Sequence, residues 1–331
     1  MSFVVSTLIP LSAIAIILAA SLNVMVGWGR MYSLAQAALY GVGAYTASLV
    51  ALHLTSDAFV VGLCAMAVAG LAGLLMAIVG SRVKLEYFVI ASLGAQIVFD
   101  GVVSNLGFTG GDGGLSGIPV MNVLGIAIST PAANAVTTGV LAIASVAFLA
   151  LLRHSAWGRQ LAAVGEDELG AASVGKRIVT ARVTAAVLSG VFAGLAGALF
   201  ANYAAFVNPA SFTSAESVTL LAMVIIGGAG TVIGPVLGAV LLTIVPALLN
   251  FFSVSPSTAG LWEEMTFGVI IVAIIRFRPD GMAGWFHAGL AAARQRGLVR
   301  PPTTGGDPLA ATAESFTGVT VTGNHESEVG R

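Results

Sequence analysis

The chain alternates between long apolar stretches and short polar connections. A helix needs roughly 20 apolar residues to cross the hydrocarbon core of a bilayer. Eight stretches approach that length, over about 3–22, 33–53, 58–80, 86–106, 132–152, 183–205, 231–250 and 260–275, and a shorter ninth covers about 217–229. Lipid offers backbone groups no hydrogen-bond partner, and the stretches lack the strict alternation of barrel strands. The pattern therefore predicts an all-α fold, a polytopic transmembrane helix bundle of about eight to ten spans with one broken or short helix.

Glycines punctuate the apolar stretches in two ways. The run Gly227–Gly230, followed by Pro235, interrupts the region between about 217 and 250, and broken helices of this kind are frequent in transporters. Other small residues recur at helical spacing, in Gly190-x-x-x-Gly194 and in Gly230-x-x-x-Gly234-x-x-x-Gly238. This spacing predicts that neighbouring helices approach closely there.

Composition supports a membrane protein and excludes several other classes. Hydrophobic residues make up 57% of the chain and charged residues 9%, whereas soluble proteins carry roughly 25% charged residues. The net charge of −1 gives no indication of nucleic-acid binding, which needs a concentrated basic surface, so nucleic acid is not an expected partner. Cys64 is the single cysteine and is interpreted as packing, and the four histidines lack ligand spacing, so no metal site is predicted.

The charges of the connections predict an orientation. All 14 Lys and Arg residues fall on alternate connections or in the C-terminal part of the chain. By the positive-inside rule, the 153–182 segment and the C-terminus are cytoplasmic. Nine crossings would then leave the N-terminus outside, provided that the short ninth segment counts. No Lys or Arg precedes the first span, which disfavours a cleavable signal peptide. We expect a transmembrane domain over 1–290 and a disordered cytoplasmic tail over 291–331.

The charged segment 153–182 contains a candidate docking helix. Leu161, Val164, Leu169 and Ala172 follow helical spacing and are predicted to share one face. Asp167 is a predicted N-cap with Glu168 in the first turn, and Gly175 fits the C-terminal cap. The alternative is an ordinary solvated loop whose charges only fix the topology. Capping and the apolar stripe favour a helix of about two turns that docks onto a soluble cytoplasmic partner.

The same segment nearly spells a phosphate-binding loop. Gly170 to Arg177 matches G-x-x-x-x-G-K, but Arg177 stands where a Ser or Thr hydroxyl should reach the magnesium ion. No apolar strand precedes it either. We therefore do not expect this chain to bind ATP.

A polar stripe marks a candidate translocation path. Ser92, Gln96 and Asp100 recur at four-residue spacing within one predicted span, and Gln36 and Tyr40 share a face of another. An ionisable group inside a bilayer usually faces the bundle interior or a water-filled path. The alternative is that Asp100 lies near enough to the outer surface to be simply hydrated.

Several motifs, taken in order, resemble the Liv-type permeases, the membrane subunits of branched-chain amino acid ABC importers. They are Gly-x-x-x-Ser-Leu-x-Gln-Ala-Ala at Gly29 to Ala38, Gly41-Val-Gly-Ala-Tyr45, the glycine-rich segment Thr109 to Pro119, Gly158-Arg-Gln-Leu-x-Ala-Val164 with Glu166 to Leu169, and Ser189 to Leu199. The resemblance covers roughly residues 20–280.

This resemblance implies a set of partners and a location. They are a second homologous permease, two cytoplasmic ATPases that bind ATP and magnesium, and an extracytoplasmic substrate-binding protein, all at the bacterial inner membrane. The permease itself would need no cofactor and no catalytic residue. On this analogy the ATPase contacts come from Glu166, Asp167, Glu168, Leu169, Ala172 and Gly175. Asp112, in the turn-rich outer segment, marks a candidate surface for the binding protein or a plain connector.

Two departures leave the cargo open. Ala35 stands where the resembling family usually has glycine, and Gly165 where it usually has arginine. Urea and short-chain amide importers use closely similar permeases, so either cargo class is compatible with these motifs. An ion-coupled transporter would need more ionisable groups near the midplane than Asp100. A membrane enzyme would need a converging catalytic set, which the spacing does not offer.

Overall fold

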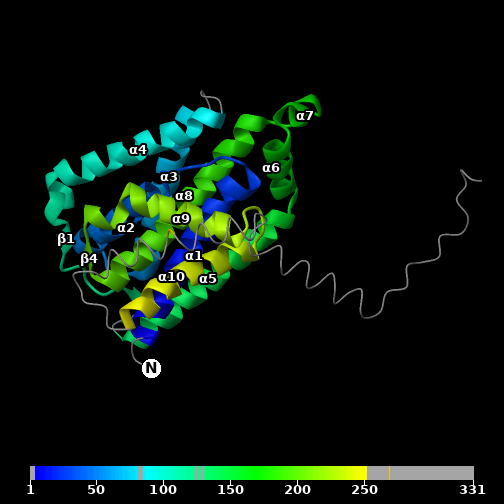
Figure 1. Cartoon of the computed structure of the whole chain (residues 1–331). Coiled ribbons are helices and arrows are strands. Elements are labelled where there is room, and N and C mark those ends of the chain that lie inside the picture. The colour runs from blue at the N-terminus through cyan, green and yellow to red at the C-terminus, as the bar shows by residue number, and fades with distance from the viewer. Residues whose placement is uncertain (1–3, 81–84, 124–125, 128–129, 252–267, 269–331) are drawn as a thin grey trace, which may run out of the picture. The chain divides into compact units, whose positions relative to one another are not determined.

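Helices account for nearly all of the regular structure in the computed structural model (Figure 1). It describes residues 4–80, 85–123, 126–127, 130–251 and 268, all of which belong to the unit Met1–Phe286. The α-helices are α1 (Ile9–Asn23), α2 (Gln36–His53), α3 (Ala58–Gly80), α4 (Leu85–Asn105), α5 (Pro131–His154), α6 (Ala156–Glu166), α7 (Glu168–Ser173), α8 (Ile178–Ala204), α9 (Ser214–Gly227) and α10 (Ile233–Phe251). Two π-helical turns, η1 (Val4–Leu8) and η2 (Val24–Trp28), extend α1 at either end.

Each apolar stretch predicted before residue 252 forms an α-helix, which confirms the all-α prediction. Six helical segments of the described chain are long and apolar enough to cross a membrane, namely Ser6–Trp28, Ala58–Gly80, Tyr87–Asn105, Pro131–His154, Ile178–Ala204 and Pro209–Gly227. The second predicted span was expected to start at about residue 33, but its helix, α2, begins at Gln36. The predicted span 260–275, apart from Gly268, and the predicted tail 291–331 lie outside the described residues.

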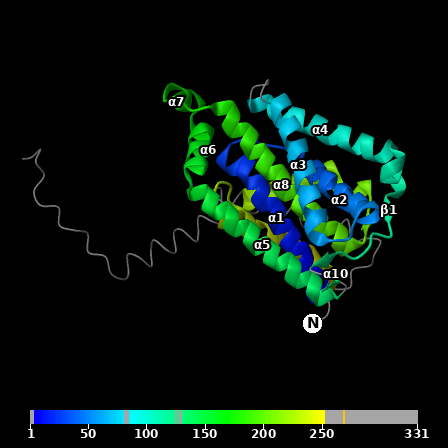
Figure 2. The ribbon, with the colours of Figure 1, turned by 180° about the vertical axis from the view of Figure 1, so that it is seen from behind.

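Helix α8 packs against α1, α2 and α3, and both views show it running between its neighbours (Figures 1 and 2). Small residues permit this close packing. A Cβ atom on Gly190 would lie 2.5 Å from the Ala69 carbonyl oxygen, and one on Gly194 would collide with the Ala65 carbonyl oxygen. The predicted role of Gly190 and Gly194 in helix packing is therefore confirmed.

The predicted break in the region 217–250 is confirmed. Helix α9 ends at Gly227 and α10 begins at Ile233. Between them Gly228 has φ 110° and Gly230 has φ 86°, a backbone region that favours glycine. The two helices then pack together, and a Cβ atom on Gly238 would collide with the Met223 carbonyl oxygen. The glycines thus serve both the turn and the close approach.

The structure adds two short antiparallel ladders that the hydrophobic pattern does not predict. Strand β1 (Leu115–Ser116) pairs with β4 (Phe206–Val207), and β2 (Asn122–Val123) pairs with β3 (Ile126–Ala127). The short 3-10 turns η3 (Gly107–Thr109), η4 (Gly111–Gly113) and η5 (Pro209–Phe212) complete this end. Strands β1 and β4 lie at one end of the bundle and α6 and α7 at the other (Figure 1).

Candidate coupling segment and translocation path

Helix α6 begins directly after α5, at a polar cap. The Ser155 hydroxyl accepts a hydrogen bond from the Gly158 N–H at 3.3 Å. The Trp157 indole N–H donates to the Thr184 hydroxyl of α8 at 2.9 Å, which ties α6 to a membrane helix. Leu161 and Val164 are fully buried. One side of α6 is therefore anchored to the bundle.

At Asp167 the backbone becomes extended, with φ −146° and ψ 105°, and α7 then starts. The Asp167 carboxylate accepts a hydrogen bond from the Gly170 N–H at 2.9 Å, so the predicted N-cap is confirmed. At the other end Gly175 has φ 75° and donates to the Ala172 carbonyl, while the Lys176 N–H donates to the Ala171 carbonyl. These two bonds form a Schellman motif, which confirms the predicted C-terminal cap.

The shared apolar face predicted across this segment is wrong. Leu161 and Val164 are buried on α6, but Leu169 is 83% exposed and Ala172 is exposed on α7. The reason is the extended residue Asp167, which interrupts the helical phase between the two pairs. The predicted stripe is thus two separate pairs: Leu161 and Val164 pack against the bundle, and Leu169 and Ala172 face away from it.

Helix α7 is held in place by charge. The Arg182 guanidinium of α8 donates to the Glu168 carboxylate at 2.7 Å. Because Glu168 is about half exposed, this pair contributes at most about 1 kcal/mol after solvent screening. Of the predicted coupling residues, Asp167, Glu168 and Gly175 thus shape and hold the turn, whereas Glu166, Leu169 and Ala172 remain exposed on it.

The end of α5 and helix α6 both contact η2, the π-helical turn at the end of α1. The Arg153 guanidinium lies 5.7 Å from the ring centroid of Trp28, within the range of a cation–π contact. A Cβ atom on Gly165 would lie 2.5 Å from the Trp28 carbonyl oxygen and 3.1 Å from the Gly29 carbonyl carbon. The glycine at position 165 therefore permits this close contact between α6 and η2.

Replacing Gly165 with alanine is expected to destabilise the protein by about 1–3 kcal/mol, because the new methyl group must push α6 away from η2. Gly139→Ala on α5 is the matched control, since a Cβ atom there would meet no atom of the described residues within 4 Å. That control should be neutral or stabilising by up to about 1 kcal/mol. Thermal denaturation of the two purified variants measures the difference, and equal midpoints would contradict the close contact.

Ser92 and Gln96 converge on the start of α2. The Leu34 N–H donates to the Ser92 hydroxyl at 2.9 Å, and the Ala38 N–H donates to the Gln96 side-chain oxygen at 2.9 Å. The Gln96 amide group in turn donates to the Phe212 carbonyl at 2.6 Å. The first N–H groups of a helix lack partners within it. Gln96 supplies a partner for one of them, the Ala38 N–H, and Ser92 supplies one for the Leu34 N–H just before the helix.

The other predicted path residues lie around the same point. Gln36 is fully buried, donates to the Ser21 hydroxyl at 2.8 Å and accepts from the Ser189 hydroxyl at 3.1 Å. Asp100 is half-buried and accepts from the Gln96 amide at 3.0 Å. Tyr40 is instead packed among aromatic rings, with centroid distances of 5.5 Å to Phe200 and 4.9 Å to Phe212. The five residues are brought into one region, and their role as a path stays a prediction.

Three partners of this polar cluster were not singled out by sequence reasoning. Ser21 comes from α1, Ser189 from α8 and Ser217 from α9, where the Ser217 hydroxyl accepts from the Ala37 N–H at 2.9 Å. Single serines in apolar helices give little signal. Asn23 was also missed, although a buried amide in an apolar stretch is a recognisable sign of an interhelical bond.

Asp112 lies in η4, at the end of the bundle that holds the strands, and it is exposed. The loop around it is shaped by glycines, since Gly110, Gly111 and Gly114 have φ of 78°, 58° and 70°. Its position leaves the carboxylate accessible to a partner. Contact with a binding protein stays a prediction.

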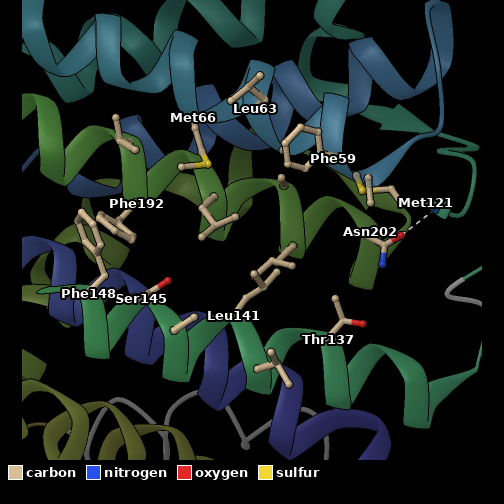
Figure 3. Close-up of a pocket in the computed structure, with 18 of the residues that line it drawn as sticks. Phe59, Leu63, Met66, Met121, Thr137, Leu141, Ser145, Phe148, Phe192 and Asn202 are labelled. Carbon is tan, nitrogen blue, oxygen red and sulfur yellow. Dashed lines mark hydrogen bonds between the residues drawn. The ribbon is translucent and has the colours of Figure 1, made fainter. Parts of the chain in front are cut away.

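An apolar groove of about 1150 Å³ opens between α3, α5 and α8 (Figure 3). Phe59, Leu63 and Phe148 line it, and Phe59 is 79% exposed. Asn202, at one end, accepts from the Met121 N–H at 3.0 Å and donates to Asn134 at 2.9 Å, so its amide is already engaged. Its walls are mostly hydrocarbon, and the polar side chains that line it, Asp57, Thr137, Ser145 and Asn202, include no cation to pair with the carboxylate of an amino acid. The groove suits lipid chains better than cargo.

A bundle of helices that are long and apolar enough to span a membrane, with a buried polar cluster and a capped helical turn displayed at one end, is the architecture of a polytopic membrane protein. The family model described as branched-chain amino acid transport system / permease component matches residues 4–275. The chain belongs to this family.

Relatives with established names agree with this assignment. The high-affinity branched-chain amino acid transport system permease protein LivM of Escherichia coli K12 is 31% identical over 301 residues, covering 82% of this chain and 68% of the relative. LivM of Salmonella typhimurium LT2 is 29% identical over 296 residues with the same coverage. The autoinducer 2 import system permease protein LsrC of Escherichia coli O9:H4 is 32% identical over 196 residues, 57% of this chain and 54% of the relative. No solved structure matches the chain significantly. The chain is thus a multi-pass membrane permease of the ABC importer type.

Proposed function

We propose that this chain is the permease subunit through which an ATP-driven importer carries branched-chain or related hydrophobic amino acids across the bacterial inner membrane. The observation that carries the proposal is α7, a short helix with a cap at each end that displays Leu169 away from the bundle. An isolated turn of this kind is marginal on its own. Its double capping and its ion pair to α8 fit a preformed docking element.

The partners follow from the two ends of the bundle. Basic residues gather near α6 and α7, which supports a cytoplasmic location for that end and an outer location for the strand end. Two ATPase subunits would contact Glu166, Leu169 and Ala172, and would themselves hold ATP and magnesium. A second homologous permease would complete the membrane part. A substrate-binding protein would dock at the outer end, where Asp112 is exposed.

The chain needs no catalytic residue for this function. ATPase subunits that bind two permease conformations with different affinity supply the drive, because a ligand shifts an equilibrium only through differential affinity. The residues Gln36, Tyr40, Ser92, Gln96 and Asp100 are proposed to line or support the path. Hydrophobic amino acids are the favoured cargo because the LivM relatives align over most of this chain.

Uptake in intact cells tests the function. Deleting the gene for this chain should lower the uptake of labelled leucine, isoleucine or valine at micromolar concentration, and the wild-type chain should restore it. A thermal-shift screen of the cognate binding protein with amino acids, urea and short-chain amides should show stabilisation by branched-chain amino acids. Stabilisation by urea or amides alone would contradict the cargo, and unchanged uptake of every cargo would contradict the permease function.

A further inference from the structure

Asn23 joins two parts of the bundle that lie far apart in the sequence. Its side-chain oxygen accepts from the Gly230 N–H at 2.9 Å, and its amide group donates to the Thr231 carbonyl at 2.8 Å. Asn23 is 2% exposed. Both bonds reach the glycine break between α9 and α10, so one buried side chain satisfies two backbone groups of a non-helical segment. Such segments are tolerated at membrane depth only when protein groups supply these bonds.

Asn23 is the last residue of α1, directly before the α-helix gives way to a π-helical turn. The next residues, Val24–Trp28, form the π-helical turn η2, in which the Gly29 N–H donates to the Val24 carbonyl at 3.3 Å. Short π-helical turns within helices are frequent at functional sites. A Cβ atom on Gly27 would collide with the Asn23 oxygen and the Gly230 nitrogen. Position 27 must therefore be glycine for the break to reach α1.

The opposite side of η2 touches the coupling segment. Trp28 lies under Arg153, its carbonyl faces Gly165 of α6, and Gly29 lies beside Leu161 of α6. The contacts are continuous from α6 through η2 to Gly230. Any displacement of α6 by an ATPase subunit must either break these contacts or carry η2 with it.

We propose that Asn23 is a positioning residue that clamps the glycine break between α9 and α10 to the π-helical turn of α1, so that movement of α6 reaches the break. The proposal rests on the proposed function for the direction of the movement, but the clamp itself does not depend on the cargo. The break is well suited to move, because Gly228 and Gly230 tolerate backbone angles that other residues resist.

Asn23→Ala removes both bonds of the clamp, and Asn23→Asp keeps an acceptor for the Gly230 N–H while losing the donor to Thr231. Leu22→Ala is the matched control: Leu22 is the buried neighbour and carries no polar group toward the break. The variants are compared in the complete transporter in nanodiscs. Amide hydrogen exchange of the peptide that contains residues 228–232 should become about tenfold faster with Asn23→Ala, and should stay as in the wild type with Leu22→Ala.

Transport supplies the readout that a purely structural role would not move. In proteoliposomes, Asn23→Ala should lower the number of cargo molecules imported per ATP about tenfold while ATP hydrolysis stays within about twofold. Asn23→Asp should show the same direction of change, which keeps the test valid if Asn23→Ala does not fold. Leu22→Ala should lower thermal stability without changing cargo per ATP.

Two results would overturn the clamp: unchanged exchange at the break in both Asn23 variants, or uptake that falls only in proportion to ATP hydrolysis, as for a destabilised protein. A wild-type complex that imports no amino acid would instead refute the proposed function. The exchange measurement would still decide the clamp in that case.

Discussion

Replacing Leu169 with serine is expected to lower ATP-driven uptake about tenfold to a hundredfold while the permease remains inserted in the membrane. Leu169 is 83% exposed on a helix that is capped at both ends, so its apolar side chain is available to fill a pocket on a partner. Burying one leucine side chain contributes roughly 1.5–3 kcal/mol. Uptake in proteoliposomes, alongside co-purification of the ATPase subunits, measures the loss.

Val174→Ser is the matched control. Val174 is 71% exposed and directly follows the same helix. Because it lies five residues after Leu169, its side chain points to a different side of the helix. The same polar replacement there should change uptake by less than about twofold, as expected for an exposed surface position. Equal losses in the two variants, or no loss at Leu169, would contradict the assignment of Leu169 as the docking anchor.

Replacing Gln96 with alanine is expected to destabilise the permease by about 2–6 kcal/mol, because the Ala38 N–H and the Phe212 carbonyl lose their partner and each unpaired buried group costs roughly 1–3 kcal/mol. Asn105→Ala is the control, since this exposed side-chain amide donates to the Gly101 carbonyl of its own helix, α4. Its effect should stay within about 0.5 kcal/mol. Thermal denaturation in detergent compares the two.

The same helix separates a structural role from a path role. Asp100→Asn keeps an oxygen that can accept from the Gln96 amide, so it should preserve stability. If Asp100 lies on the translocation path, this variant nevertheless slows uptake. Normal uptake with Asp100→Asn would remove Asp100 from the path, and normal stability with Gln96→Ala would contradict the role of Gln96 at the start of α2.

Local sequence signals predicted the two caps of α7. They did not predict which residues of the segment are buried against the rest of the bundle. Asp167 and Gly175 were recognised as caps because each acts on backbone groups within a few residues. The burial of Leu161 against the exposure of Leu169 was not foreseen, since periodicity assumes an unbroken helix and Asp167 is extended. A cap residue that starts a new helix also ends the phase of the previous one.

The polar cluster shows the same limit. Four-residue spacing brought Ser92 and Gln96 to one face of α4, as the sequence indicated, but it could not show that this face meets the start of α2. The apolar pattern also placed the second span too early, since Leu34 is apolar and yet bonds Ser92 outside the helix. Pairings such as Gln36 with Ser189 join residues from different spans, and hydropathy carries no information about them.

The glycines show which close contacts could be predicted from the sequence and which could not. Gly190 and Gly194 were read correctly because small residues at helical spacing have one common use, close packing. Gly27 carried no such pattern, and its closeness to Gly230 depends on how α1 packs beside the break. Asn23 is a similar case. A buried amide could be noticed in the sequence, but its partner Gly230, far away in the chain, could not be predicted.

ATP-driven transport by the purified complex tests the central claim most directly. This chain, its partner permease and the ATPases are reconstituted in vesicles that contain ATP, with the binding protein and labelled leucine outside and ionophores present to collapse ion gradients. The account predicts leucine accumulation that requires hydrolysable ATP and is lost with a non-hydrolysable analogue. Accumulation that needs no ATP, or that appears only when the ionophores are left out and a proton or sodium gradient is imposed, would contradict it.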